Sequence, residues 1–141
     1  MHFNEVSLKS RKHKKEIVKI VSQVIDEGVF FNGPQIRTLE ENLTSFFGSG
    51  YLSTVASGHD ALILALSALN LGKTDEVIFP VNAVPTAFPI CLSGAKPIPV
   101  DVDENGQLDP EELAKKLSKR TKVVVLVHLY GLVGNIKTIL E

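Results

Sequence analysis

Short apolar runs separated by helical segments constrain the fold of this chain more than any other feature. Three of them, residues 76–79, 97–103 and 123–127, have the composition of β-strands. The segments between these runs are too long for hairpins, so consecutive strands are expected to run in parallel. The last run is rich in β-branched residues, which is typical of a strand covered on both faces. The sequence therefore predicts an α/β fold in three layers (αβα), with a mostly parallel sheet between helices.

A strand, a turn and a helix are predicted around Ser57. Residues 51–55 are expected to form a short strand, and a helix that is apolar on nearly every side follows from about Asp60. Backbone N–H groups in the first turn of such a helix lack partners, and together with the helix dipole they favour a phosphate-sized anion. His59 is a candidate to offer that anion its N–H group and its imidazole. The turn thus predicts a phosphate site, while a plain cap by Ser57 or His59 on a buried helix explains the same residues equally well.

Two amphipathic helices are predicted before this turn. Apolar residues recur every three or four positions between residues 17 and 25, and Gly28 marks the end of that helix. Pro34 stands at the first position of the second helix, which ends at Gly48. Each helix is expected to bury one face only.

Composition limits the class of protein. The 141 residues are 44% hydrophobic and carry a net charge of -1, which suits one globular domain and gives no overall attraction to nucleic acid or to an anionic membrane. The basic residues 11–15 lack interleaved aromatic residues and are expected to be a solvated helix start. No apolar run has the length of a bilayer, and the single cysteine, Cys91, is expected to be buried and reduced. We expect a soluble, cytoplasmic protein.

Several common site motifs are absent or misplaced in the sequence. Gly48-Ser49-Gly50 lies between a helix and a strand, which is the wrong order for a dinucleotide-binding turn, and no G-x-x-x-x-G-K-[ST] run is present. The four histidines and one cysteine have no metal-ligand spacing, so no metal site is predicted. Asp101 and Asp103 stand just before an Asn-Gly pair, which favours a solvated turn over a catalytic carboxylate pair.

The carboxyl ends of parallel strands are the expected location of ligands. The turn at Ser57 and residues 128–131 both lie at such ends. His128 and Tyr130 would project to opposite sides if the strand continued through them. One of the two would then face a cleft, or both would form hydrogen bonds at the strand end.

Two further helix starts are predicted in the second half of the chain. Residues 81–92 contain two prolines, which indicates a broken or late-starting helix. Asp109 and Glu112 have the spacing of a capping box, and the helix that they begin is expected to carry Leu113 and Leu117 inward.

A series of motifs in this order resembles one known family. They are Asn32-Gly33-Pro34, residues 55–62 (VASGHDAL), residues 75–80 (DEVIFP), residues 94–97 (GAKP), residues 100–103 (VDVD) and residues 127–131 (VHLYG). Together they are similar to the DegT/StrS family of nucleotide-sugar aminotransferases, which depend on pyridoxal 5'-phosphate (PLP) and are a branch of fold type I. The resemblance runs from about Gly28 to the last residue and covers roughly the first third of such an enzyme.

The resemblance implies the N-terminal part of the large domain of a fold type I transferase. Residues 1–28 would be an N-terminal helical segment, and residues 29–141 a partial large domain truncated at its C-terminus. The implied cofactor is PLP, bound at Ser57, Gly58, His59 and Asp60, where the family has the turn S-G-T-D-A-L. A homodimer with shared active sites, a nucleotide-sugar substrate, glutamate as amino donor and a role in polysaccharide biosynthesis are implied as well.

The sequence departs from the family pattern in three ways. His59 replaces a threonine, so one hydroxyl contact to the phosphate is lost. Residues 81–85 lack the aromatic side chain that stacks on the cofactor ring. The Schiff-base lysine and the aspartate that pairs with the pyridine nitrogen belong to later parts of the family fold, beyond Glu141, so no catalytic residue is predicted in this chain.

We therefore expect an N-terminal aminotransferase fragment that is inactive alone. Two alternatives remain open at this point. One is a fragment of a sugar dehydratase that uses the same cofactor, and the other is a non-catalytic remnant that binds a partner through an exposed face.

Overall fold

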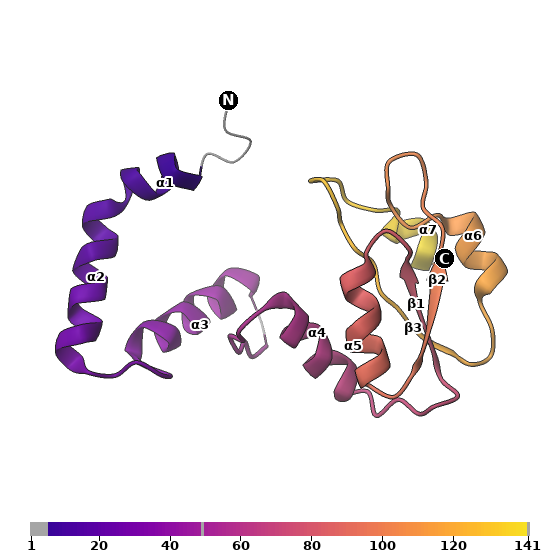
Figure 1. Cartoon of the computed structure of the whole chain (residues 1–141), viewed down its shortest axis with the longest axis horizontal. Helices are drawn as coiled ribbons and strands as arrows, with labels where there is room; N and C mark the ends of the chain where they lie inside the picture. The colour runs from indigo at the N-terminus through magenta and orange to yellow at the C-terminus, as the bar shows by residue number, and fades with distance from the viewer. Residues whose placement is uncertain (1–5, 49, 141) are drawn as a thin grey trace. The chain divides into compact units, whose positions relative to one another are not determined.

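The structure, a computed structural model, describes residues 6–48 and 50–140 and divides the chain into two compact units (Figure 1). The first unit is Met1–Thr54 and the second is Val55–Glu141. The expected boundary at residue 28 stays a prediction. Within the described residues, no helix has both the length and the apolar composition that a membrane span requires.

In the described residues of the first unit, the regular structure is three helices: α1 (Val6–Lys12), α2 (Lys14–Glu27) and α3 (Pro34–Phe47). Gly28 adopts a left-handed φ of 68° after α2 and donates its N–H group to the Val24 carbonyl at 3.0 Å. Gly48 ends α3 with a φ of 81°, and Pro34 begins it. The predicted ends of both long helices are confirmed. Neither α2 nor α3 contains a buried residue.

The strand expected at residues 51–55 does not form, and the segment is irregular instead. The backbone of this segment forms a hydrogen bond with a side chain and not with a neighbouring strand. Glu40 of α3 accepts the Thr54 N–H at 2.7 Å and the Thr54 hydroxyl at 3.0 Å. A carboxylate that receives these bonds competes with sheet pairing, which explains why the prediction for this segment is wrong.

The second unit alternates helices with strands. Its elements are α4 (Gly58–Ser67), β1 (Glu76–Pro80), η1 (Val84–Thr86), α5 (Ala87–Leu92), β2 (Lys96–Val100), α6 (Pro110–Lys116), β3 (Thr121–Val124) and α7 (Ile136–Leu140). The three strands pair in parallel in the order β2-β1-β3. Ile78 in the middle of β1 faces Ile98 on one side and Val124 on the other. The predicted parallel sheet is confirmed.

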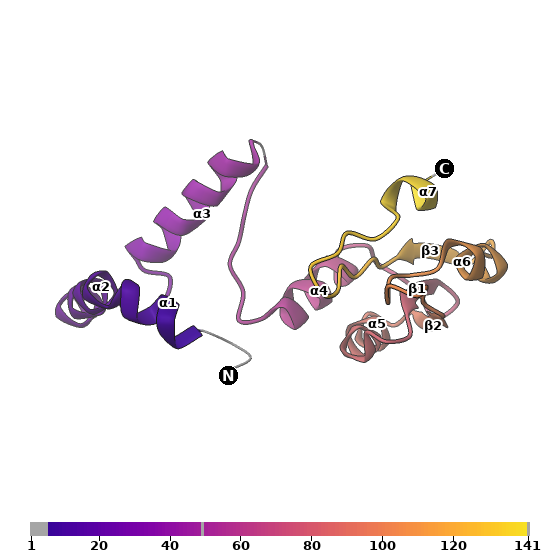
Figure 2. The same cartoon turned by 90° about the horizontal axis from the view of Figure 1, so that it is seen from above.

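Two hydrophobic clusters cover the two faces of this sheet, because successive residues of β1 point to opposite sides. One cluster contains Leu66, Val77, Phe79, Ile90 and Ala95, and the other contains Ile78, Val100, Leu108 and Leu113. Helices α4 and α5 contribute to the first cluster and α6 to the second, so α5 and α6 lie on opposite sides of the strands (Figure 2). The three-layer αβα prediction is confirmed.

Local details of the second unit differ from the sequence predictions. Helix α4 has one buried residue, Leu66, while Leu64 is 58% exposed, so the helix is less covered than its composition indicates. Strand β3 ends at Val124, although the next N–H group still donates to the Ile78 carbonyl at 2.8 Å. Cys91 is exposed, because the short α5 directs Ile90 toward the sheet and leaves its neighbour facing away.

Helix α6 begins as predicted but uses only half of the capping box. The Asp109 carboxylate accepts the N–H groups of Glu111 and Glu112 at 2.8 and 3.4 Å. The Glu112 side chain does not return to the cap and instead accepts a hydrogen bond from Lys115 at 2.6 Å, which raises the pKa of that lysine. Leu113 is buried as expected, whereas Leu117 is 53% exposed because the helix has already ended.

A buried carboxylate joins the amino ends of β1 and β3. Glu76 is 4% exposed and accepts hydrogen bonds from the Ser118 hydroxyl at 2.6 Å and from Arg120 Nε at 2.9 Å. The Glu76 N–H also donates to the Arg120 carbonyl at 2.8 Å. The Ser118 bond first, and the Arg120 bond second, lower the pKa of Glu76. The amino ends of these strands are therefore held together by hydrogen bonds with a structural role. Ligands are then expected at the carboxyl ends of the strands.

Candidate functional site

The carboxyl edge of the sheet brings together loops that follow all three strands. Asn82, after β1, donates its side-chain amide to the Gly106 carbonyl at 2.9 Å in the loop after β2. Gly106 has a φ of 73°, and a Cβ atom added there would lie 3.1 Å from Cε2 of Tyr130, after β3. The hydrogen bond from Asn82 thus links the first two loops, and Gly106, which has no Cβ atom, leaves room for the ring of Tyr130.

The side chains of His128 and Tyr130 are positioned by a turn and not by a strand. Tyr130 has a φ of 61° and is 79% exposed. His128 Nδ1 accepts the Gly134 N–H at 3.1 Å. We expected the two side chains to project to opposite sides only if the strand continued through them. The strand ends at Val124, so this expectation does not apply. His128 has a structural hydrogen bond, whereas the Tyr130 side chain has none among the described residues, so the second of the two interpretations holds for His128 only.

The acidic segment after β2 is a hydrogen-bonded turn, as the sequence predicts. Asp103 Oδ1 accepts the N–H groups of Asn105 and Gln107, both at 2.9 Å. Asp101 accepts the Val102 N–H at 2.9 Å. Both carboxylates are thus engaged in local backbone bonds. In residues 6–48 and 50–140, no group of three or more His, Cys, Asp or Glu side chains is arranged to hold a metal ion.

Ser57 caps helix α4. Its backbone is extended, with φ −157° and ψ 164°, and its hydroxyl accepts the Asp60 N–H at 3.1 Å. The same hydroxyl donates to Asp60 Oδ2 at 2.8 Å. The plain capping interpretation is therefore correct for Ser57, and the pair of side chains fixes where the helix begins.

The next two backbone N–H groups are open. Within the part of the chain that the structure describes, the N–H groups of Gly58 and His59 have no acceptor. They adjoin a hollow of about 170 Å³ that is lined by Gly58, His59, Leu62, Pro85 and Thr86. A Cβ atom added to Gly58 would meet nothing within 4 Å, so the approach to these donors is unobstructed.

The imidazole of His59 stacks on Phe88 of α5. The ring centroids are 5.6 Å apart and the planes are inclined by 24°. Phe88 is 60% exposed, so the pair lies at the surface beside the hollow. Residues 81–85 lack an aromatic residue, and Phe88 is the aromatic side chain that this region places near the turn. Sequence reasoning missed Phe88 because only the path of η1 and α5 brings it next to α4.

The donor set of this turn fits a phosphate group. Two unpaired N–H groups lie at the start of a ten-residue helix, where they offer hydrogen bonds and the positive end of the helix dipole. The residues that line the hollow include no lysine or arginine, so the described part of the site offers neutral donors. Ser57, Gly58, His59 and Asp60 are brought together as predicted, but the Ser57 hydroxyl is directed into the helix cap.

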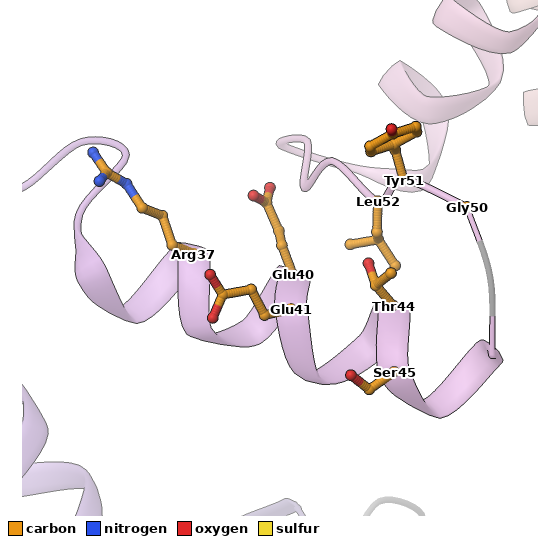
Figure 3. Close-up of a pocket in the computed structure, with 8 residues that line it drawn as sticks. All are labelled: Arg37, Glu40, Glu41, Thr44, Ser45, Gly50, Tyr51 and Leu52. Carbon is orange, nitrogen blue, oxygen red and sulfur yellow. The ribbon is translucent and has the colours of Figure 1, made fainter.

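A larger hollow in the first unit, of about 490 Å³, is a poor candidate for an anion (Figure 3). It is formed by α3 and the segment that follows, and Glu40 and Glu41 both contribute carboxylates, against one guanidinium from Arg37. The Thr54 N–H, and then the Thr54 hydroxyl, lower the pKa of Glu40 and keep it ionised. A net negative lining repels phosphate, so the smaller hollow at α4 is the candidate site.

A parallel sheet with an open helix start at the carboxyl ends of its strands defines an α/β protein whose candidate site is suited to an anionic ligand. The chain belongs to the DegT/DnrJ/EryC1/StrS aminotransferase family, whose sequence model matches residues 11–141.

Curated relatives of this chain include sugar aminotransferases. The dTDP-3-amino-3,6-dideoxy-alpha-D-galactopyranose transaminase of Aneurinibacillus thermoaerophilus is 35% identical over 122 residues, which is 85% of this chain and 34% of that protein. The UDP-2-acetamido-2-deoxy-3-oxo-D-glucuronate aminotransferase of Pseudomonas aeruginosa is 36% identical over 133 residues, or 93% of this chain and 37% of that protein. The chain thus spans about a third of the length of these relatives.

Solved structures of the family have the same fold. S. venezuelae DesV, in complex with a ketimine intermediate, superposes with a TM-score of 0.90 at 30% identity, over 99% of this chain and 38% of that chain. A GDP-4-keto-6-deoxymannose-3-dehydratase with a trapped PLP-glutamate geminal diamine superposes with a TM-score of 0.79 at 31% identity, over 86% of this chain and 34% of that chain. The matching structures therefore include a dehydratase that holds PLP as an adduct with glutamate.

Proposed function

We propose that this chain carries the phosphate-binding part of a PLP-dependent aminotransferase that acts on keto-sugar nucleotides, with glutamate as amino donor. The observation that supports the proposal is the pair of open N–H groups of Gly58 and His59, which belong to the turn that holds the cofactor phosphate in the family. The sugar aminotransferases among the relatives support the substrate class.

The residues of this chain would bind and orient the cofactor. When bound, PLP supplies the electron sink for amino transfer. Gly58 and His59 would donate their N–H groups to its phosphate, and the dipole of α4 would favour the negative charge. Ser57 and Asp60 would hold the first turn of α4 in the geometry that directs those donors outward.

We further propose that the 141 residues alone do not catalyse transamination. No lysine of the chain stands in the family motif for covalent attachment of the cofactor, nor does the chain hold the family's aspartate for the pyridine nitrogen. A homodimer, a role in polysaccharide biosynthesis and a cytoplasmic location remain part of the proposal. Amino transfer from glutamate to a keto-sugar nucleotide by the purified chain, followed by mass spectrometry, would contradict the proposed inactivity.

Two other functions have support from particular observations. The structural match to a GDP-4-keto-6-deoxymannose-3-dehydratase favours a sugar dehydratase with the same cofactor. The exposed apolar side chains of α2, such as Ile25 at 62%, favour a partner-binding remnant. Sizing the chain across a range of concentrations tests the latter, because such a surface associates as the concentration rises.

Binding of pyridoxamine 5'-phosphate tests the phosphate site directly. This form of the cofactor has no aldehyde and cannot form adducts with surface lysines, and pyridoxamine is the matched ligand without phosphate. We expect the chain to prefer the phosphorylated ligand in a fluorescence titration. Equal affinity for the two ligands would contradict the proposal.

A pair of variants at one position separates the N–H donor from the shape of the turn. Gly58→Pro removes the N–H group at the first position of a helix, where proline is favoured, and Ser57 is already extended as proline requires. We expect about tenfold weaker binding of pyridoxamine 5'-phosphate, the typical cost of a lost bond to a charged group. Gly58→Ala keeps the donor and should bind like the wild type.

A further inference from the structure

Thr86 borders the hollow at α4 from a different element. It is the last residue of η1, and its N–H group donates to the Ala83 carbonyl at 2.9 Å, which fixes its backbone. The residue is 7% exposed and lines the hollow together with Gly58 and His59. A buried polar residue thus shares the lining of this hollow with the residues that carry the two open N–H groups.

The hydroxyl of Thr86 has no hydrogen-bond partner in the part of the chain that the structure describes. A threonine in a helical turn often bonds to the carbonyl four residues earlier, as Thr38 does to Pro34 at 2.9 Å, but Thr86 forms no such bond. Among the described side chains, Gln107 Oε1 is the polar atom that is fully buried without a partner. The Thr86 hydroxyl oxygen is also unpaired but is not fully buried, so a ligand can reach it. Leaving a hydroxyl of a buried residue unpaired is unfavourable unless a ligand or water completes it.

The Thr86 hydroxyl is also the hydroxyl group in the lining of the hollow. Of the residues that line the hollow, Thr86 alone carries a hydroxyl group. The nearby Ser57 hydroxyl is occupied, because it accepts from and donates to Asp60. Position 59 carries an imidazole that stacks on Phe88.

We propose that Thr86 is a phosphate-binding residue, whose hydroxyl donates a hydrogen bond to the same phosphate group that the Gly58 and His59 N–H groups bind. The inference rests on the proposed function of the α4 turn. It adds a third donor from a second element, so the phosphate would connect η1 to the start of α4. The ligand chemistry is a phosphate monoester, because two N–H donors and one O–H donor belong to residues that line one small hollow without a lysine or an arginine.

Two variants of Thr86 test this role. Thr86→Val has nearly the same shape but no hydroxyl, and Thr86→Ser retains the hydroxyl. We expect Thr86→Val to bind pyridoxamine 5'-phosphate about tenfold more weakly than the wild type, and Thr86→Ser to remain within about threefold. Pyridoxamine, which lacks the phosphate, should bind equally to all three proteins in the same fluorescence titration.

Stability of the free protein provides a readout that does not depend on binding. Because the Thr86 hydroxyl is unpaired, Thr86→Val should leave the Tm unchanged or raise it. A lower Tm would assign the hydroxyl a structural bond and overturn the inference.

The possible failures are distinguishable. If the wild type prefers pyridoxamine 5'-phosphate and Thr86→Val binds it equally well, the inference fails and the phosphate site at Gly58 stands. If Thr86→Val weakens both ligands equally, the hydroxyl does not act on the phosphate, and the inference fails as well. If the wild type does not distinguish the two ligands, the proposed function fails and the inference falls with it.

Discussion

The two units of this chain are built from equally regular helices but differ in what those helices bury. In Met1–Thr54, α2 and α3 are complete and correctly ended, yet neither has a buried residue. In Val55–Glu141, residues such as Val77, Ile78 and Ile90 have no exposed surface at all. The difference teaches that capping and periodicity specify a helix, whereas a core requires a second surface of complementary shape.

The candidate site depends on the unit that has the core. The open N–H groups at α4 and the hydroxyl of Thr86 border one hollow because α4 and α5 pack against the sheet through Leu66 and Ile90, and η1 leads directly into α5. The large hollow of the first unit relies on one helix and an irregular segment. The candidate site therefore lies where packing fixes several elements at once, as a precise ligand site requires.

The largest expected effect comes from matched isoleucine truncations in the two units. Ile78→Ala removes a side chain with no exposed surface, and we expect it to lower the free energy of unfolding by about 2–5 kcal/mol. Ile20→Ala in α2, where the side chain is 48% exposed, should lower it by less than about 1 kcal/mol. Urea unfolding followed by circular dichroism measures both. Similar losses in the two variants would break the comparison between the units.

A smaller effect is expected at the capped helix of the second unit. Asp109→Ala removes the acceptor of two N–H groups at the start of α6 and should cost about 1 kcal/mol of stability. Lys116→Ala on the exposed side of the same helix serves as the control and should stay within about 0.5 kcal/mol. Equal urea midpoints for the two variants would show that the cap contributes nothing to the unit.

Acid should affect the two units through different carboxylates. The pKa of Glu76 is lowered in the folded state by Ser118 and then Arg120, so its stabilising effect is present above the ordinary value of 4.5 and is lost as the pH falls through the lowered pKa. Ser118→Ala should raise the pKa of Glu76 toward 4.5, as measured by carboxyl-carbon NMR, and should flatten the loss of stability in acid. The pKa of Glu40, which is lowered by Thr54 in the first unit, should not move.

The smallest expected effect concerns the aromatic pairs, of which each unit has one among its described residues. Phe88→Ala removes the partner of His59, and Phe47→Ala removes the edge-on partner of Phe46, whose ring centroid is 5.3 Å away. Both rings are mostly exposed, so each change should alter stability by less than about 1 kcal/mol. Phe88→Ala should nevertheless shift the ring-proton NMR signals of His59. Unchanged His59 signals would mean that the pair is not stacked in solution.

Features that depend on neighbours in the sequence could be predicted well. The ends of α2 and α3 follow from Gly28, Pro34 and Gly48, because each residue has a strong local preference for its backbone conformation. The parallel sheet follows from the spacing of its strands. The start of α4 follows from small residues that directly precede an apolar helix.

Features that depend on the path of the chain could not be predicted. Phe88 and Thr86 reach the α4 turn only because η1 and α5 cross beside it, and nothing in their spacing from Ser57 indicates this. The exposure of Cys91 depends on the short length of α5. The loss of the strand at residues 51–55 results from a side chain of α3, which competes for the backbone of Thr54.

The order of the strands has a consequence for synthesis of the protein on the ribosome. The central strand β1 is synthesised first. Glu76 of β1 pairs with Lys96 of β2, which follows it by 20 positions, and with Thr121 of β3, which follows it by 45. At a translation rate of roughly 5–20 residues per second, β1 waits about 2–9 seconds for its second partner. During that interval the most apolar strand of the sheet is exposed to other nascent chains. Early binding by a chaperone would therefore benefit residues 76–80 more than any later segment of the sheet.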